Sequence, residues 1–140
     1  CTGAPLSALR KAMALQEQNG AIFSGTVWDN LFLPEEKREN AAGLLAEMAF
    51  EKPLNTPVTS GGGNLSPGER KKLLLVRCLL REVPFLLLDE PLNHLDAPGR
   101  TVLSRYLASR TGILLVSHQE PDLPVLLFRP FSLAVSASKK

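Results

Sequence analysis

The sequence has few cysteines, few aromatic residues and no long apolar run. Aromatic residues make up 6% of the 140 positions, and the two cysteines are Cys1 and Cys78. Cys78 lies in an apolar stretch, so we expect a buried free thiol in a reducing compartment. No segment approaches the roughly 20 apolar residues that a bilayer-spanning helix needs, and no signal peptide is recognisable. A net charge of +2 is too small to indicate nucleic acid or an anionic membrane surface as a partner.

The 140 residues also contain no phosphate-binding loop of the Gly-x4-Gly-Lys-Ser/Thr type. Gly63 and Gly68 have the glycine spacing, but Glu69 and Arg70 follow where lysine and a hydroxyl residue are needed. An acidic side chain at that position repels phosphate. The chain begins at Cys1 and not at methionine, so we expect either a processed chain or an excerpt of a longer one.

The remaining pattern is typical of a folded α/β domain. Hydrophobic residues make up 44% and charged residues 21% of the chain. Apolar runs predict strands over residues 12–15, 85–88 and 113–116, with two short ones over 125–128 and 131–135. Helices are predicted over residues 6–11, 35–50, 67–81 and 97–110, and a loop over 53–63. This alternation of strands and helices predicts a parallel sheet.

The strongest helix start in the chain lies at Ser66. Ser66 suits the N-cap, Pro67 the first helical position, and Glu69 completes a capping box. A helix N-terminus can also bind an anion such as phosphate, and Gly68 leaves room for one. Helix capping and anion binding are both open to these residues.

Polar side chains follow the ends of the predicted strands, where ligands bind in parallel sheets. Asp89 and Glu90 come directly after an apolar run, and His118 ends the next one. A carboxylate there can hold Mg²⁺, and the next acid can polarise an attacking water. The alternatives are a solvated pair of acids and a structural histidine. Gln18 lies in a polar loop and is uninformative by itself.

The order and spacing of these features resemble the nucleotide-binding domain of the ATP-binding-cassette (ABC) superfamily. Residues 64–96, NLSPGERKKLLLVRCLLREVPFLLLDEPLNHLD, look like its signature, helix, Walker B and D-loop block. ILLVSH (113–118) ends where the switch histidine would lie, and LRKAMALQEQNGAIFSGTVWDNL (9–31) is similar to the Q-loop region of exporters. The alignment favours Gln18 as the Q-loop glutamine, and Gln16, two residues earlier, is the alternative. The resemblance covers roughly residues 9–119.

The resemblance implies a P-loop NTPase-like parallel sheet with a helical signature subdomain, incomplete without Walker A. It divides the chain into a Q-loop region (9–31), a helical and signature region (34–82), a Walker B, D-loop and switch region (83–119) and a tail (120–140). It implies ATP and Mg²⁺ as cofactors. Asp89 would support the metal, Gln18 would contact the metal or the attacking water, Glu90 would be the general base, and His118 would contact the γ-phosphate. Ser66, Gly68 and Glu69 would approach the ATP of a partner cassette, and Asp96 would belong to the D-loop between the two sites.

The resemblance also implies partners and a location. A second cassette in a head-to-tail dimer and transmembrane transporter domains would be the partners, at the cytoplasmic face of a membrane, with no nucleic acid. Pro67 stands where the family usually has glycine, which predicts a weaker signature. Two other functions stay open. One is a non-catalytic half-cassette that lends its signature in trans, and the other is a soluble ABC ATPase acting on ribosomes or DNA, as the NHLD sequence hints. Without Walker A we do not expect the isolated chain to hydrolyse ATP. We also expect it to expose a face of its sheet and to be poorly soluble or only partly folded.

Overall fold

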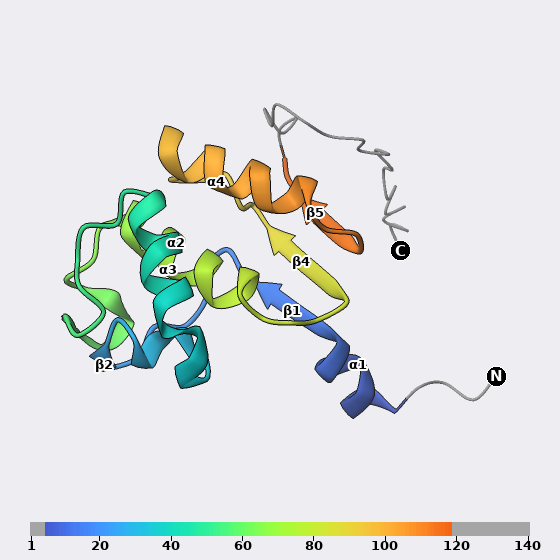
Figure 1. The fold of residues 1–140 in the computed structure, drawn as a ribbon, viewed down its shortest axis with the longest axis horizontal. Helices are drawn as coiled ribbons and strands as arrows, with labels where there is room; N and C mark the ends of the chain where they lie inside the picture. The colour runs from blue at the N-terminus through green and yellow to red at the C-terminus, as the bar shows by residue number, and fades with distance from the viewer. Residues whose placement is uncertain (1–4, 119–140) are drawn as a thin grey trace, which may run out of the picture.

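A three-stranded parallel sheet is the centre of the computed structural model, which describes residues 5–118 (Figure 1). Its strands are β1 (Met13–Gln16), β4 (Phe85–Asp89) and β5 (Ile113–Val116), in the order β1-β4-β5. The register places Leu15, Leu87 and Leu114 in one row across the sheet. The parallel sheet confirms the predicted α/β fold. All three strands lie within one residue of their predicted positions.

Two helices carry the chain between these strands and pack on one face of the sheet. α3 (Pro67–Leu79) leads into β4, and α4 (Ala97–Ala108) connects β4 to β5. Alternate strand residues on that face, such as Ala14, Leu86 and Leu88, are fully buried. The opposite face is open: Leu15 is 56% exposed, Leu114 41% and Val116 48%. The open face agrees with the sequence-based expectation, whereas solubility stays a prediction.

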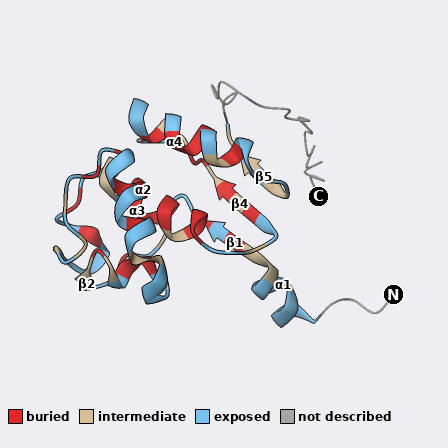
Figure 2. Cartoon of the chain, in the orientation of Figure 1, coloured by how far each residue is buried: buried red, intermediate tan, exposed pale blue. Residues whose placement is uncertain are grey.

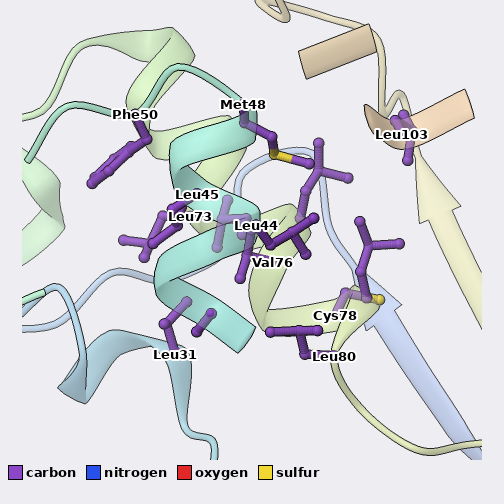
Figure 3. Close-up of a cluster of buried hydrophobic side chains, with 14 of the residues drawn as sticks. Leu31, Leu44, Leu45, Met48, Phe50, Leu73, Val76, Cys78, Leu80 and Leu103 are labelled. Atoms are coloured by element: carbon purple, nitrogen blue, oxygen red, sulfur yellow. The ribbon is translucent and has the colours of Figure 1, made fainter. Parts of the chain in front are cut away.

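A helical region lies beside the sheet between β1 and β4 in the sequence. It contains α2 (Arg38–Glu47), a two-stranded antiparallel pair of β2 (Gly25–Thr26) and β3 (Pro57–Val58), and three 3-10 turns: η1 (Asp29–Leu31), η2 (Glu35–Lys37) and η3 (Ser60–Gly62). Figure 3 shows side chains of α2 and α3, among them Leu44, Leu45, Leu73 and Val76, gathered in one core. Figure 2 shows α3 mostly buried, whereas α1 (Leu6–Ala12) has no buried residue. α3 is therefore the helix that joins the helical region to the sheet.

The helix expected over residues 35–50 is shorter in the structure, because residues 35–37 form η2 and the last turn of α2 closes at Met48. Ala49 adopts a left-handed backbone with φ of 56°. The N–H of Phe50 donates to the carbonyl of Leu45, and the N–H of Ala49 donates to Ala46, both at 2.9 Å. This pair of bonds is a Schellman motif, which usually carries glycine where Ala49 stands.

Other expectations differ in smaller ways. α3 ends at Leu79 and α4 at Ala108, each two residues before its predicted end. The predicted loop 53–63 contains β3 and η3. The two strands expected over 125–128 and 131–135 lie outside the described residues. Within residues 5–118, no helix has both the length and the apolar character to cross a bilayer.

Candidate functional site

Glu90 lies at the carboxyl end of β4, where its carboxylate is held by the end of β5. Its side chain is 6% exposed. Oε1 accepts a hydrogen bond from the backbone N–H of His118 at 2.7 Å, and Oε2 accepts one from Oγ of Ser117 at 3.4 Å. The N–H of Glu90 donates to the carbonyl of Val116 at 2.8 Å. The structure thus brings Glu90 and His118, 28 residues apart in the sequence, to the same point.

The imidazole ring of His118 and the carboxylate of Glu90 differ greatly in solvent exposure. Nε2 of His118 lies 3.5 Å from Oε1 of Glu90, yet the His118 side chain is 91% exposed. Asp89, the last residue of β4, is half-buried. A buried, oriented carboxylate beside an exposed imidazole is an arrangement suited to accepting a proton from water and contacting an anion in solvent.

A buried lysine of α3 reaches the same turn from the other side. Lys71 is 4% exposed, and its ammonium donates to the backbone carbonyl of Glu90 at 2.8 Å. Burial lowers the pKa of Lys71, and the negative charges of Asp89 and Glu90 partly oppose that shift. Glu90 itself has a left-handed backbone, with φ of 48°. The main chain of Glu90 is thus hydrogen-bonded at its N–H, to Val116, and at its carbonyl, to Lys71.

The next residue of α3 holds the far end of the same loop. Lys72, 5% exposed, donates to Oδ2 of Asp96 at 2.7 Å and to the carbonyl of Ala49 at 3.3 Å. Asp96 is also the N-cap of α4, accepting from the N–H of Gly99 at 3.1 Å. Consecutive lysines of one helix thus fix the start and the end of the loop between Glu90 and Asp96.

Ser66 and Glu69 form the helix start that the sequence predicts. Ser66 is the N-cap of α3, and its Oγ accepts from the N–H of Glu69 at 3.1 Å, while Oε2 of Glu69 accepts from the N–H of Ser66 at 2.8 Å. Oε1 of Glu69 also pairs with Lys52. At Gly68 a Cβ atom would lie 3.1 Å from the carbonyl oxygen of His94. The capping box is confirmed, and a role of Ser66, Gly68 and Glu69 toward a nucleotide stays a prediction.

The two glutamines near the end of β1 occupy different environments. Gln16 is 2% exposed, its Nε2 donates to the carbonyl of Glu17 at 2.6 Å, and its Oε1 has no hydrogen-bond partner within the described residues. Gln18 is exposed and lines a cavity of about 640 Å³, together with Pro67, Lys71 and His94. The structure therefore places Gln18, and not Gln16, on the surface, in a cavity that the start of α3 also lines.

The donor set at this point fits a metal that arrives with a phosphate. No group of three or more His, Cys, Asp or Glu side chains in residues 5–118 could hold a metal ion by itself. Mg²⁺ is usually bound by one or two carboxylates together with water and substrate phosphates. Asp89, half-buried at the strand end, is the carboxylate available for that role.

Comparison with known proteins identifies the family. The model of the ABC transporter family matches residues 2–93. The chain belongs to the ABC transporter family.

Relatives in this family come from transport and from translation. The chain is 38% identical over 109 residues to Elongation factor 3 of Pneumocystis carinii, covering 76% of this chain and 10% of the relative. It is 34% identical over 123 residues to CydC, the Glutathione/L-cysteine transport system ATP-binding/permease protein of Escherichia coli (strain K12), covering 81% of this chain and 22% of the relative. This chain thus spans between a tenth and about a fifth of the length of these two relatives.

The fold is similar to that of a solved ABC exporter. A bacterial Atm1-family exporter with ATP bound superposes with a TM-score of 0.67 at 24% identity, covering 78% of this chain and 22% of the exporter chain. The predicted P-loop NTPase-like fold is therefore confirmed, and this ABC chain is a part of a nucleotide-binding domain.

Sequence reasoning missed Lys71 and Lys72, although a signal was present. Leu74, Leu75 and Cys78 follow Lys71 at the spacing of one helix face, and all three are buried. A lysine at the head of an apolar helical stripe must either extend to solvent or find a buried partner. In this ABC domain both lysines have a partner in the segment from Glu90 to Asp96.

Proposed function

We propose that the chain is the ATP-binding and ATP-hydrolysing component of an ABC transporter. In this proposal a Walker A segment and a second cassette complete the site, and transmembrane domains hold it at the cytoplasmic face of a membrane. The observation that carries the proposal is the placement of Glu90: a buried carboxylate at the end of a parallel strand, oriented by the backbone of His118 at 2.7 Å.

The proposed chemistry uses Glu90 as the general base. ATP would supply the phosphoryl group and release ADP, and Mg²⁺ would neutralise the negative charge of the phosphates. Glu90 accepts a proton from the attacking water, because its carboxylate is fixed in direction and lies beside the exposed edge of the site. Asp89 holds the metal, and His118, exposed and 3.5 Å from Glu90, contacts the outer phosphate oxygen.

The signature residues act on the other cassette in this proposal. Ser66 caps α3, so the positive end of the helix dipole lies at Gly68 and Glu69, although the N–H of Glu69 is already bonded to Oγ of Ser66. Together with Asp96 they would face the nucleotide that the partner holds. Gln18 lies in the exposed turn after β1. It would contact Mg²⁺ or the attacking water, and it would also sense the coupling helices of the transmembrane domains.

A second candidate is a soluble ABC ATPase that acts in translation. It is favoured by the 38% identity to Elongation factor 3, a value above that for CydC. The two candidates share the same hydrolytic residues and differ in what the rest of the polypeptide contacts.

The test uses the longest natural polypeptide that carries this sequence. Phosphate release from Mg-ATP is measured for the protein in lipid nanodiscs, with and without added ribosomes. We expect saturable, Mg²⁺-dependent hydrolysis in nanodiscs that ribosomes do not stimulate. Absence of hydrolysis would contradict the proposal, and a water-soluble protein stimulated by ribosomes would favour the second candidate.

A further inference from the structure

Lys71 is a buried cation whose partner is a main-chain carbonyl. Its side chain lies on the face of α3 that also carries Leu74, Leu75 and Cys78, and it is 4% exposed. A buried ammonium is costly unless it is hydrogen-bonded and its charge is offset. The carbonyl of Glu90 supplies the hydrogen bond at 2.8 Å, and the carboxylates of Asp89 and Glu90 supply nearby negative charge.

The carbonyl that Lys71 holds belongs to a strained residue. Glu90 has φ of 48°, a region that residues with a side chain rarely adopt. Pro91 follows it, and a following proline favours extended backbone. Local preference therefore opposes this conformation, so tertiary contacts must maintain it.

Hydrogen bonds hold three groups of Glu90: its N–H, its carboxylate and its carbonyl. Val116 receives the N–H, and the end of β5 holds the carboxylate through His118. The carbonyl accepts from Lys71 and, at 3.2 Å, from the N–H of Asn93. Asn93 belongs to the same loop as Glu90, whereas Lys71 belongs to the packed helix α3. The Lys71 hydrogen bond therefore anchors this carbonyl to the core. Without it, only the N–H of Asn93 holds this carbonyl, so the backbone at Glu90 can leave its left-handed conformation and carry the Glu90 side chain with it.

We infer that Lys71 is a positioning residue for hydrolysis: its hydrogen bond to the Glu90 carbonyl fixes the left-handed turn that aims the Glu90 carboxylate at the attacking water. The inference rests on the proposed role of Glu90 as general base. Lys71 acts through Glu90 and makes no contact with substrate in this role. The essential property is a hydrogen-bond donor, so a glutamine, which keeps a neutral N–H donor on a side chain one atom shorter, should largely replace it and a methionine should not.

The experiment compares Lys71→Met and Lys71→Gln in the longest natural polypeptide that carries this sequence. Lys37→Met is the matched control, because Lys37 pairs with Glu82 on the surface. Steady-state hydrolysis gives kcat and KM for ATP, and thermal melting checks folding. Amide hydrogen exchange at Asn93 reports the turn directly and does not depend on hydrolysis.

Lys71→Met should lower kcat by about 10- to 100-fold with KM nearly unchanged, since misplacing a reacting group costs rate and not binding. Exchange at Asn93 should rise about tenfold or more, while amides of α4 stay protected. Lys71→Gln should keep kcat within about threefold of the wild type, a difference of less than 1 kcal/mol. Lys37→Met should match the wild type in both readouts.

Other results would overturn the inference or the proposed function. Unchanged kcat or unchanged Asn93 exchange in a folded Lys71→Met protein overturns the inference. So does a folded Lys71→Gln protein as slow as Lys71→Met, because a neutral donor at residue 71 would then not be enough to hold the turn. If Lys71→Met does not fold, Lys71→Gln alone decides by whether it keeps the wild-type rate. If the wild type hydrolyses no ATP, the proposed function fails, and Asn93 exchange still decides whether Lys71 holds the turn.

Discussion

Nζ of Lys72 lies 2.7 Å from Oδ2 of Asp96, which joins the signature helix to the first turn of α4. The lysine side chain is 6% exposed and the carboxylate 49%. Burial would raise the pKa of Asp96, but hydrogen bonds from Lys72 and from the N–H of Gly99 outweigh it and hold the pKa below its ordinary value of 3.8. The pair therefore stabilises the folded state most when Asp96 is ionised.

The first prediction concerns the pH dependence of this pair. A depressed folded-state pKa gives stability that is present above the ordinary value of 3.8 and is lost as the pH falls through the lower folded value. Asp96→Asn, which keeps a capping side chain, should lower the free energy of unfolding at pH 7 by about 1–2 kcal/mol after allowance for solvent screening. Urea unfolding at pH 7 and pH 3 should show the difference shrinking at the lower pH. A difference that grows on acidification would contradict this account.

The second prediction compares two glycines. Gly112 has φ of 77°, and an added Cβ would lie 2.4 Å from the carbonyl oxygen of Pro84. Gly112→Ala should lower the free energy of unfolding by about 2–4 kcal/mol, from backbone strain and overpacking. Gly43→Ala is the matched control, since nothing lies within 4 Å of its added Cβ inside α2. It should raise the free energy of unfolding by about 0.5–1 kcal/mol. Equal effects of the two substitutions would contradict the structure at the start of β5.

The third prediction concerns the end of α2. Ala49 occupies the left-handed position of a Schellman motif with φ of 56°. Ala49→Gly removes that strain and costs some unfolded-state entropy, for a net stabilisation of about 0.5–1 kcal/mol. Thermal melting measures it. Destabilisation would show that residue 49 does not hold this conformation in solution.

The fourth prediction concerns the open face of the sheet. The 140-residue chain expressed alone should self-associate through the apolar row that includes Leu15 and Leu114. Leu15→Lys with Leu114→Lys should reduce light scattering at equal concentration. Leu6→Lys, on the exposed face of α1, is the control and should not. A monomeric wild-type chain with a sharp cooperative melt would count against the prediction.

Local signals in the sequence predicted the elements that depend on neighbouring residues. The capping pattern of Ser66 and Glu69 predicted the start of α3, and the apolar runs predicted β4 and β5, because each signal lies within a few residues. The end of α2 was not predictable. Residue 49 is alanine and not the glycine that usually marks such a helix end. Its conformation is held by contacts across the fold, including the hydrogen bond from Lys72.

The candidate site was predictable in its acids and its histidine but not in its supports. Asp89, Glu90 and His118 follow strand ends, which parallel topology brings to one edge. Lysine is rarely fully buried, and the apolar residues that follow Lys71 on the helix face do not indicate which group would pair with it. Their partners, Glu90 and Asp96, lie 19 and 24 residues further along the chain, and only the folded structure brings them together.

The central claim is that Glu90 is the base that activates water for ATP hydrolysis. The most direct measurement is the identity of the bound nucleotide after the longest natural polypeptide carrying this sequence is incubated with radiolabelled Mg-ATP and separated from free nucleotide. Glu47→Gln is the control, because Glu47 pairs with Arg105 on the surface. We predict bound ADP for the wild type and for Glu47→Gln, and bound ATP for Glu90→Gln, with turnover reduced by about 100-fold or more. Bound ADP and unchanged turnover in Glu90→Gln would contradict the claim.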